Sequence, residues 1–176
     1  RMKENIGRTE MPTDVYYANL DGNWNANGNS LIGEYDIYVD DAIDFYSDVM
    51  VGRALVASLA EARIFVDKTL HYSSGSNPGV WQRTVLSLAQ QLFTHLDGAY
   101  WSELILDNFP ATWLSKRLYE NYQDYPGSLV ENVENALAYM DSGANIISHI
   151  GHGDELRLDL GTEFMERFQL AGLSND

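Results

Sequence analysis

The chain has 176 residues, of which 45% are hydrophobic and 21% charged, a composition typical of a globular domain rather than of a disordered segment. Its formal net charge at pH 7 is −15, from 26 acidic and 11 basic side chains. This balance argues against nucleic acid and anionic membrane surfaces as partners, because both are bound through clustered Lys and Arg. It favours high solubility, bound cations or basic partners.

The sequence contains no cysteine, which excludes disulfides, thiolate metal sites and a thiol nucleophile within these residues. No apolar run approaches the roughly 20 residues that span a bilayer. The polar segment 1–11 has no secretory apolar region, so we expect any signal peptide to lie outside this sequence.

In the N-terminal part, residues 13–19 predict a strand that follows Pro12, and residues 20–36 predict a loop rich in turns. The apolar stretch within residues 45–53 predicts a short buried strand. A capping box that begins at Ser58 indicates a helix that extends to about His71. The inward face of this helix is predicted from apolar residues at helical spacing, namely Leu59, Ala62, Val66 and Leu70.

The rest of the chain alternates between predicted strands and helices. Strands are expected at residues 84–89 and 112–119, with a helix at 98–108 between them. A β-rich run at 145–150 ends at Gly151.

Two further helices are predicted from the residues at their ends. A second capping box at Ser128 would begin one helix, which Gly143 would end. Thr162 would cap another helix that ends near Gly172. The residues after it form a predicted loop that should lead into another strand.

This alternation predicts an α/β fold, in which helices cover both faces of a mostly parallel sheet in a three-layer α/β/α sandwich. Because a further strand is expected after residue 176, we expect the sheet to be incomplete. The predicted organisation is a polar segment at 1–11, a strand and loop at 12–44, and an α/β core at 45–176.

Asparagines recur at alternate positions in the predicted loop, in the spacing of an EF-hand calcium loop. Gly28 falls where that motif needs a sharp turn, and Glu34 falls where it needs a bidentate carboxylate. The neutral asparagines make the match poorer in charge than in spacing. The alternative is a cluster of Asn/Gly turns, because both residues tolerate positive φ. The predicted calcium ligands are Asp21, Asn23, Asn25, Asn27, Asn29, Leu31 and Glu34, with Asp36, Asp40 and Asp41 as nearby carboxylates.

The second candidate site is His152, between Gly151 and Gly153 at the end of the last predicted strand. The carboxyl edge of a parallel sheet is where catalytic groups gather in α/β folds. An imidazole there is suited to take a proton from a thiol and return it to a leaving amine, and the Gly153 N–H could stabilise an oxyanion. The alternative is a structural loop histidine.

The other three histidines have weaker contexts. His149 lies on the predicted strand and is expected to be a packing residue, while His71 and His95 are expected at the surface or at helix ends. The spacing of the histidines is weak evidence for zinc, and the sequence contains no HExxH motif. It also contains no P-loop or GxGxxG motif for nucleotides and no GxSxG motif of serine hydrolases.

Taken together in order, several segments resemble the gingipain-like cysteine peptidase family, which belongs to the caspase-like fold group. The resemblance extends from about residue 11 to the end of the chain. Its segments are Pro12 to Trp24, Gly33-Glu34, Asp48-Val49-Met50-Val51-Gly52-Arg53, Lys68-Thr69-Leu70-His71-Tyr72 and Gly151-His152-Gly153.

The resemblance implies a partial peptidase domain with a histidine–cysteine dyad, in which His152 is the general base and acid and the cysteine follows the next strand. Some members of the family have an acidic residue that orients the histidine, and Gln90 stands at the corresponding position. A dyad is therefore expected rather than a triad. The resemblance also implies a protein or peptide substrate and an extracellular or cell-envelope location, and it favours calcium in the asparagine loop.

Two other functions remain open. One is a non-catalytic pseudopeptidase or an envelope or secretion component that keeps the fold and the calcium loop. The other is a soluble α/β binding domain without bound calcium. The sequence that follows residue 176 would decide between the peptidase and the pseudopeptidase, because only the peptidase needs a cysteine there.

Overall fold

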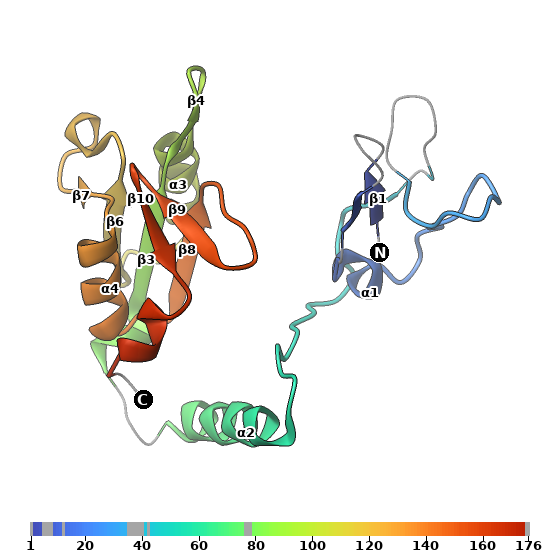
Figure 1. Cartoon of the computed structure of the whole chain (residues 1–176), viewed down its shortest axis with the longest axis horizontal. Coiled ribbons are helices and arrows are strands. Elements are labelled where there is room, and N and C mark those ends of the chain that lie inside the picture. The colour runs from blue at the N-terminus through green and yellow to red at the C-terminus, as the bar shows by residue number, and fades with distance from the viewer. Residues whose placement is uncertain are drawn as a thin grey trace. The chain divides into compact units, whose positions relative to one another are not determined.

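The computed structural model in Figure 1 describes residues 2–4, 9–11, 13–34, 41, 43–75 and 79–174. They fall into two separate units, residues 1–67 and 68–176. The second unit carries the sheet and the predicted catalytic histidine. The predicted carboxylates Asp36 and Asp40 lie outside the described residues.

The sheet of the second unit consists of β3 (Thr84–Ala89), β6 (Leu114–Tyr119), β7 (Leu129–Val130) and β8 (Ile146–Ile150). Their order is β7-β6-β3-β8, and every neighbouring pair is parallel. Three of these strands confirm the predictions for the segments near 84–89, 112–119 and 145–150, and the parallel pairing confirms the predicted α/β class.

Strand β3 is interior, and all six of its residues are buried. A run without polar alternation is typical of a strand covered on both faces. On one face, Leu86 and Leu88 pack with side chains of α4 (Val133–Asp141). On the other, Ala89 packs with Ala99 of α3 (Gly98–Leu106). The helices therefore lie on opposite faces of the sheet, which makes the predicted three layers (Figure 1).

The caps of α3 and α4 explain where these helices begin. The Asp97 carboxylate accepts from the Ala99 N–H at 2.9 Å, and the Asn132 side chain accepts from the Asn135 N–H at 2.8 Å. The predicted capping box at Ser128 is wrong, because the next two residues form β7 and the helix begins only after Asn132. Gly143, at φ +86°, follows the end of α4 as predicted.

The predicted helix from Thr162 to Gly172 is also wrong. That region instead contains β10 (Glu163–Glu166), which forms an antiparallel hairpin with the preceding β9 (Arg157–Leu160), and the 3-10 turn η3 (Gln169–Gly172). Burial explains the difference, because Leu160 and Met165 join the core cluster beneath the hairpin. Alternating side chains of a hairpin reach that core from one face, so packing outweighs the cap signal.

Shorter elements complete the second unit. A small hairpin of β4 (Gln91–Phe93) and β5 (Leu96–Asp97) follows β3 directly and extends past the end of that strand in Figure 1. The 3-10 turns η1 (Val80–Arg83) and η2 (Tyr122–Asp124) precede β3 and follow β6.

The first unit contains the two-stranded sheet of β1 (Met2–Glu4) and β2 (Thr9–Met11). The strand predicted at 13–19 is wrong, because Val15–Ala18 form the one-turn helix α1. Thr13 favours this turn, since its hydroxyl accepts from the Val15 N–H at 3.2 Å.

Packing in the first unit centres on Trp24, which is 6% exposed. Its indole N–H donates to the side-chain oxygen of Asn19 at 3.2 Å, and the same oxygen accepts from the Gly22 N–H at 2.7 Å. A side chain at Gly22 would overlap Asn19. Arg53 forms a hydrogen-bonded ion pair with Asp14. The hydrogen bond from Arg53 holds the pKa of Asp14 below its usual range.

The strand predicted within residues 45–53 is wrong as well. Residues 49–51 have no regular structure, and Val49 and Met50 are exposed. The predicted helix is present as α2 (Leu59–Ser74), and the Ser58 hydroxyl accepts from the Glu61 N–H at 3.2 Å as a capping box requires. Its predicted inward face is wrong, since no residue of α2 is buried.

None of the helices in the described part of the chain is long and apolar enough to cross a membrane.

Glu131 is a buried acid between β7 and α4, and it is 2% exposed. Its Oε2 accepts from the Gly161 N–H at 2.9 Å, while its Oε1 has no partner among the described residues. Burial raises the pKa of Glu131 to about 8; the Gly161 hydrogen bond opposes this shift and the charge of Glu120 adds to it. Glu163 also faces this region, because it accepts from the Val133 N–H.

We therefore predict that Glu131 makes the folded protein less stable as the pH rises from about 4.5 to about 8. Within this window the folded state keeps the proton and the unfolded state has lost it, so unfolding releases a proton and stability falls with pH. Glu131→Gln should remove this dependence and raise the free energy of unfolding above pH 8 by about 2–4 kcal/mol. Urea unfolding at several pH values measures it. Equal pH slopes for both proteins would contradict the prediction.

Candidate functional site

The carboxyl ends of β3 and β8 bring the predicted histidine beside Gln90. The Gln90 N–H donates to the Ile150 carbonyl at 2.9 Å, which continues the ladder one residue past β3. Beyond Ile150, the chain turns through Gly151, His152 and Gly153. The structure therefore places His152 at the edge of the sheet where the sequence analysis expected it.

The backbone of His152 is held from two sides. Its N–H donates to Gln90 Oε1 at 3.0 Å, and its carbonyl accepts from the Asp159 N–H at 3.0 Å. The imidazole itself is exposed, and the ring of Phe93 meets it edge to face with 6.0 Å between ring centroids. The side chain can thus reach a substrate while the main chain is fixed.

Gly151 allows the close approach of groups around the histidine turn. A Cβ atom at this position would lie 2.5 Å from Nε2 of His149 and 2.8 Å from Oε1 of Gln90. Both distances are shorter than real Cβ contacts, so any larger residue would displace one of these side chains.

Gly153 pairs with Leu158 in an isolated antiparallel bridge. The hydrogen bonds of this bridge join the flanking residues, Asp159 to His152 and Asp154 to Arg157, at 3.0 Å each. Gly153 and Leu158 therefore form a non-hydrogen-bonded pair. Within the described residues, the N–H of Gly153 has no acceptor, so it is free to donate to a substrate oxygen.

The remaining histidines differ in position. His149 is half-buried, and its Nε2 lies 3.0 Å from the Asp159 carbonyl, as suits a packing residue. His95 stacks on Phe93 with 6.4 Å between centroids, on the β4–β5 hairpin. Phe93 was not predicted as a site residue, and the available signal was its position four residues after an interior strand.

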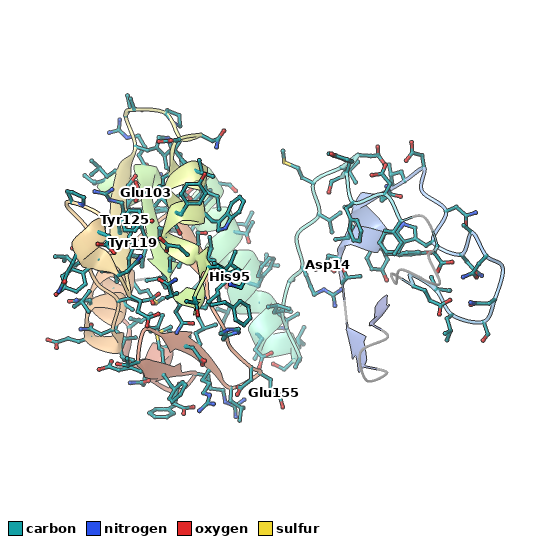
Figure 2. All side chains as sticks on the ribbon, turned by 90° about the horizontal axis from the view of Figure 1, so that it is seen from above. Asp14, His95, Glu103, Tyr119, Tyr125 and Glu155 are labelled. Carbon is teal, nitrogen blue, oxygen red and sulfur yellow. The ribbon has the colours of Figure 1, made fainter. Side chains whose placement is uncertain are left out.

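A second polar network lies on the α3 face of the sheet, and Figure 2 labels three of its members. Glu103 Oε1 accepts from the Tyr119 hydroxyl at 2.7 Å, and Arg117 pairs with the same carboxylate at 3.1 Å. Burial, followed by the Glu103 hydrogen bond, raises the pKa of Tyr119. Tyr125 donates to Asp97, and burial again raises its pKa. These contacts join α3 to β6.

The asparagine loop folds as a series of Asx turns. The side-chain oxygens of Asn23, Asn27 and Asn29 each accept from the backbone N–H two residues later, at 3.1, 3.0 and 2.6 Å; the last of these donors is Leu31. Gly28 has φ +68°, as predicted for the turn. Alternate asparagines therefore turn their side chains back onto the loop, a geometry shared by calcium loops and by ordinary Asx turns.

The same loop gathers several of the predicted calcium ligands. The amides of Asn27 and Asn29 both donate to Oε2 of Glu34, and the Glu34 N–H donates to Asp41 Oδ2 at 2.9 Å. Asp41 is fully buried, and its Oδ1 has no partner among the described residues; nor does Oδ1 of Asn25. Such orphaned oxygens suit a cation.

The fit to calcium is partial. No group of three or more His, Asp or Glu side chains in the described part of the chain could hold a metal ion. Asp21, the first of the predicted ligands, is exposed. The amides of Asn27 and Asn29 would also have to turn their oxygens inward.

A comparison with known families places these observations in context. The model of peptidase family C25 matches residues 2–176. No curated protein and no solved structure matches the chain.

Gly151→Ala should destabilise the second unit by about 1–3 kcal/mol, because the added Cβ forces His149 or Gln90 to move. Gly172→Ala is the matched control, since a Cβ there meets nothing within 4 Å. It should change stability by less than about 0.5 kcal/mol. Thermal unfolding of both variants tests this, and equal melting temperatures would contradict the close approach at Gly151.

Proposed function

Because the chain belongs to peptidase family C25, the gingipain-type cysteine peptidases, we propose that His152 is the general base and acid of an endopeptidase. Its substrate is a protein or peptide. The nucleophilic thiol comes from outside residues 1–176, because these contain no cysteine. The observation that carries the proposal is the exposed imidazole on a turn whose backbone is fixed on both sides.

In the proposed reaction, the His152 imidazole takes the proton of the thiol, and the thiolate attacks the peptide carbonyl carbon. The carbonyl oxygen becomes an oxyanion, which the free N–H of Gly153 stabilises. His152 then returns the proton to the leaving amine. Water hydrolyses the acyl-enzyme with His152 again as the base, which regenerates the thiol.

Strand β8 supports a position for the nucleophile. It is the edge strand of the sheet in the described residues, and its outer side has no hydrogen-bonded neighbour there. A further parallel strand paired with β8 would end at the same edge as His152, since carboxyl ends of parallel strands share one edge. We propose that the nucleophilic cysteine follows that strand.

The test uses the full-length protein with His152→Ala, and His71→Ala, an exposed histidine on α2, as control. Loss of general acid–base catalysis should lower kcat by about 10²–10⁴-fold with little change in melting temperature. The control should keep its activity. Peptide hydrolysis measures both. Equal activity in His152→Ala and the wild type, or a full-length sequence without a downstream cysteine, would overturn the proposal; the latter outcome would favour a pseudopeptidase.

We also propose that the asparagine loop binds a structural Ca²⁺. The orphaned oxygens of Asn25 and Asp41, together with the Glu34 carboxylate, support it. Neutral ligands predict weak binding, in the range of about 10⁻⁴–10⁻³ M found for extracellular calcium modules. This range agrees with the extracellular or cell-envelope location that we propose from the family.

At 10 mM Ca²⁺, such an affinity should stabilise the protein by about 2 kcal/mol and raise its melting temperature by about 5 °C relative to EDTA. Glu34→Gln should abolish this rise. Glu134→Gln, the same change at an exposed position of α4, should leave it intact. Scanning fluorimetry with Ca²⁺ and Mg²⁺ measures the shifts. An unchanged melting temperature in the wild type would show that the loop is a set of Asx turns without calcium.

A further inference from the structure

Gln90 lies directly after β3 and is 6% exposed. Its main chain is fixed on both sides, because its N–H donates to the Ile150 carbonyl at 2.9 Å and its carbonyl accepts from the Gly98 N–H at 3.0 Å. The side chain therefore leaves a rigid point between β8 and α3.

Both ends of the Gln90 amide are used. Oε1 accepts from the His152 N–H at 3.0 Å, and Nε2 donates to the Gly161 carbonyl at 3.0 Å. The partners decide the orientation of the amide, since one is a donor and the other an acceptor. A carboxylate of the same shape could accept from His152, but it could not donate to Gly161.

Gly161 lies in the turn of the β9–β10 hairpin and is held from its other side by Glu131. Its N–H donates to Glu131 Oε2 at 2.9 Å. Its φ is +58°, and a Cβ there would lie 2.7 Å from the Glu131 carbonyl oxygen. A continuous chain of hydrogen bonds thus joins Glu131, Gly161, Gln90 and His152. The side chains of Glu131 and Gln90 in this chain are almost fully buried.

We infer that Gln90 is the positioning residue of His152, which it holds by the backbone N–H while its amide is tied through Gly161 to the buried Glu131. This inference rests on the proposed role of His152. Among the described residues, no hydrogen bond joins Gln90 to the imidazole. Gln90 therefore fixes the position of the turn and does not stabilise the charge of the ring. An acidic residue, as some members of the family have at this position, would lose the Gly161 bond unless it were protonated.

Gln90→Glu is therefore the most informative variant. A protonated carboxyl can donate to Gly161 and accept from His152, as the amide does, whereas a carboxylate cannot. The ionisable groups that face position 90 are His149 and His152 from the β8 side, Glu120 after β6 and Glu131 behind Gly161. Burial and the charge of Glu120 favour the neutral form of a new carboxyl, and Glu131 does so once it ionises, while a protonated imidazole favours the charged form.

The first experiment uses the 176-residue chain and measures hydrogen exchange of the His152 amide by NMR. In the wild type, this N–H should exchange at least about tenfold more slowly than in Gln90→Met, which removes both bonds. Gln91→Glu is the control, because the neighbouring Gln91 is exposed and lies outside the network. It should leave the exchange unchanged. An unprotected His152 amide in the wild type would overturn the inference without any variant.

The second experiment measures kcat and KM for peptide hydrolysis by the full-length protein. Gln90→Met should lower kcat about 10–100-fold and change KM less than about threefold, because misplacing the general base by about 1 Å affects the chemical step. For Gln90→Glu, the ratio of its kcat to that of the wild type should be near one at about pH 6 and fall at least about fivefold at about pH 8.5.

Wild-type kcat in Gln90→Met, or a Gln90→Glu ratio independent of pH, would overturn the positioning role. The proposed function fails separately, in the His152→Ala assay. If His152→Ala is fully active, the exchange experiment still tests whether Gln90 holds the turn.

Discussion

The burial of β3 between two parallel neighbours determines where the groups of the candidate site lie. Its pairing with β6 and β8 brings the ends of all three strands to one edge. Because β3 is paired on both sides and all six of its residues are buried, a slip in register would disrupt the packing on both of its faces. The main chain of Gln90, the first residue after β3, is therefore held in place independently of the contacts of its side chain.

Hydrogen bonds then connect the end of β3 to the turn that carries His152. Gln90 fixes one side of this turn, and the β9–β10 hairpin fixes the other through Asp159. The hairpin is in turn held by the core residues Leu160 and Met165. A general base must be open to substrate and still precisely placed. The second unit combines a rigid main chain with an exposed side chain at His152, in line with the role that we propose for it.

The sequence was sufficient to predict three strands of the sheet, their parallel pairing and the place of His152, because these strands are rich in apolar residues and glycines flank the turn. The sequence was misleading where a local signal competed with burial in the folded core. Thr162 resembles a helix cap, yet the burial of Met165 decides for a strand, and that burial depends on residues far away in sequence. The family resemblance links Gln90 to the histidine, but it does not predict the bonds that Gln90 makes, because the partners His152 and Gly161 are 62 and 71 residues away.

The isolation of the imidazole from the hydrogen bonds that hold the turn has an evolutionary consequence. The fold uses only the peptide groups of His152, which any residue except proline supplies in full. Selection for folding therefore does not preserve the histidine itself, whereas selection for the catalytic role that we propose would. A lineage that no longer needed proteolysis could lose the imidazole by one substitution and keep the scaffold for another use.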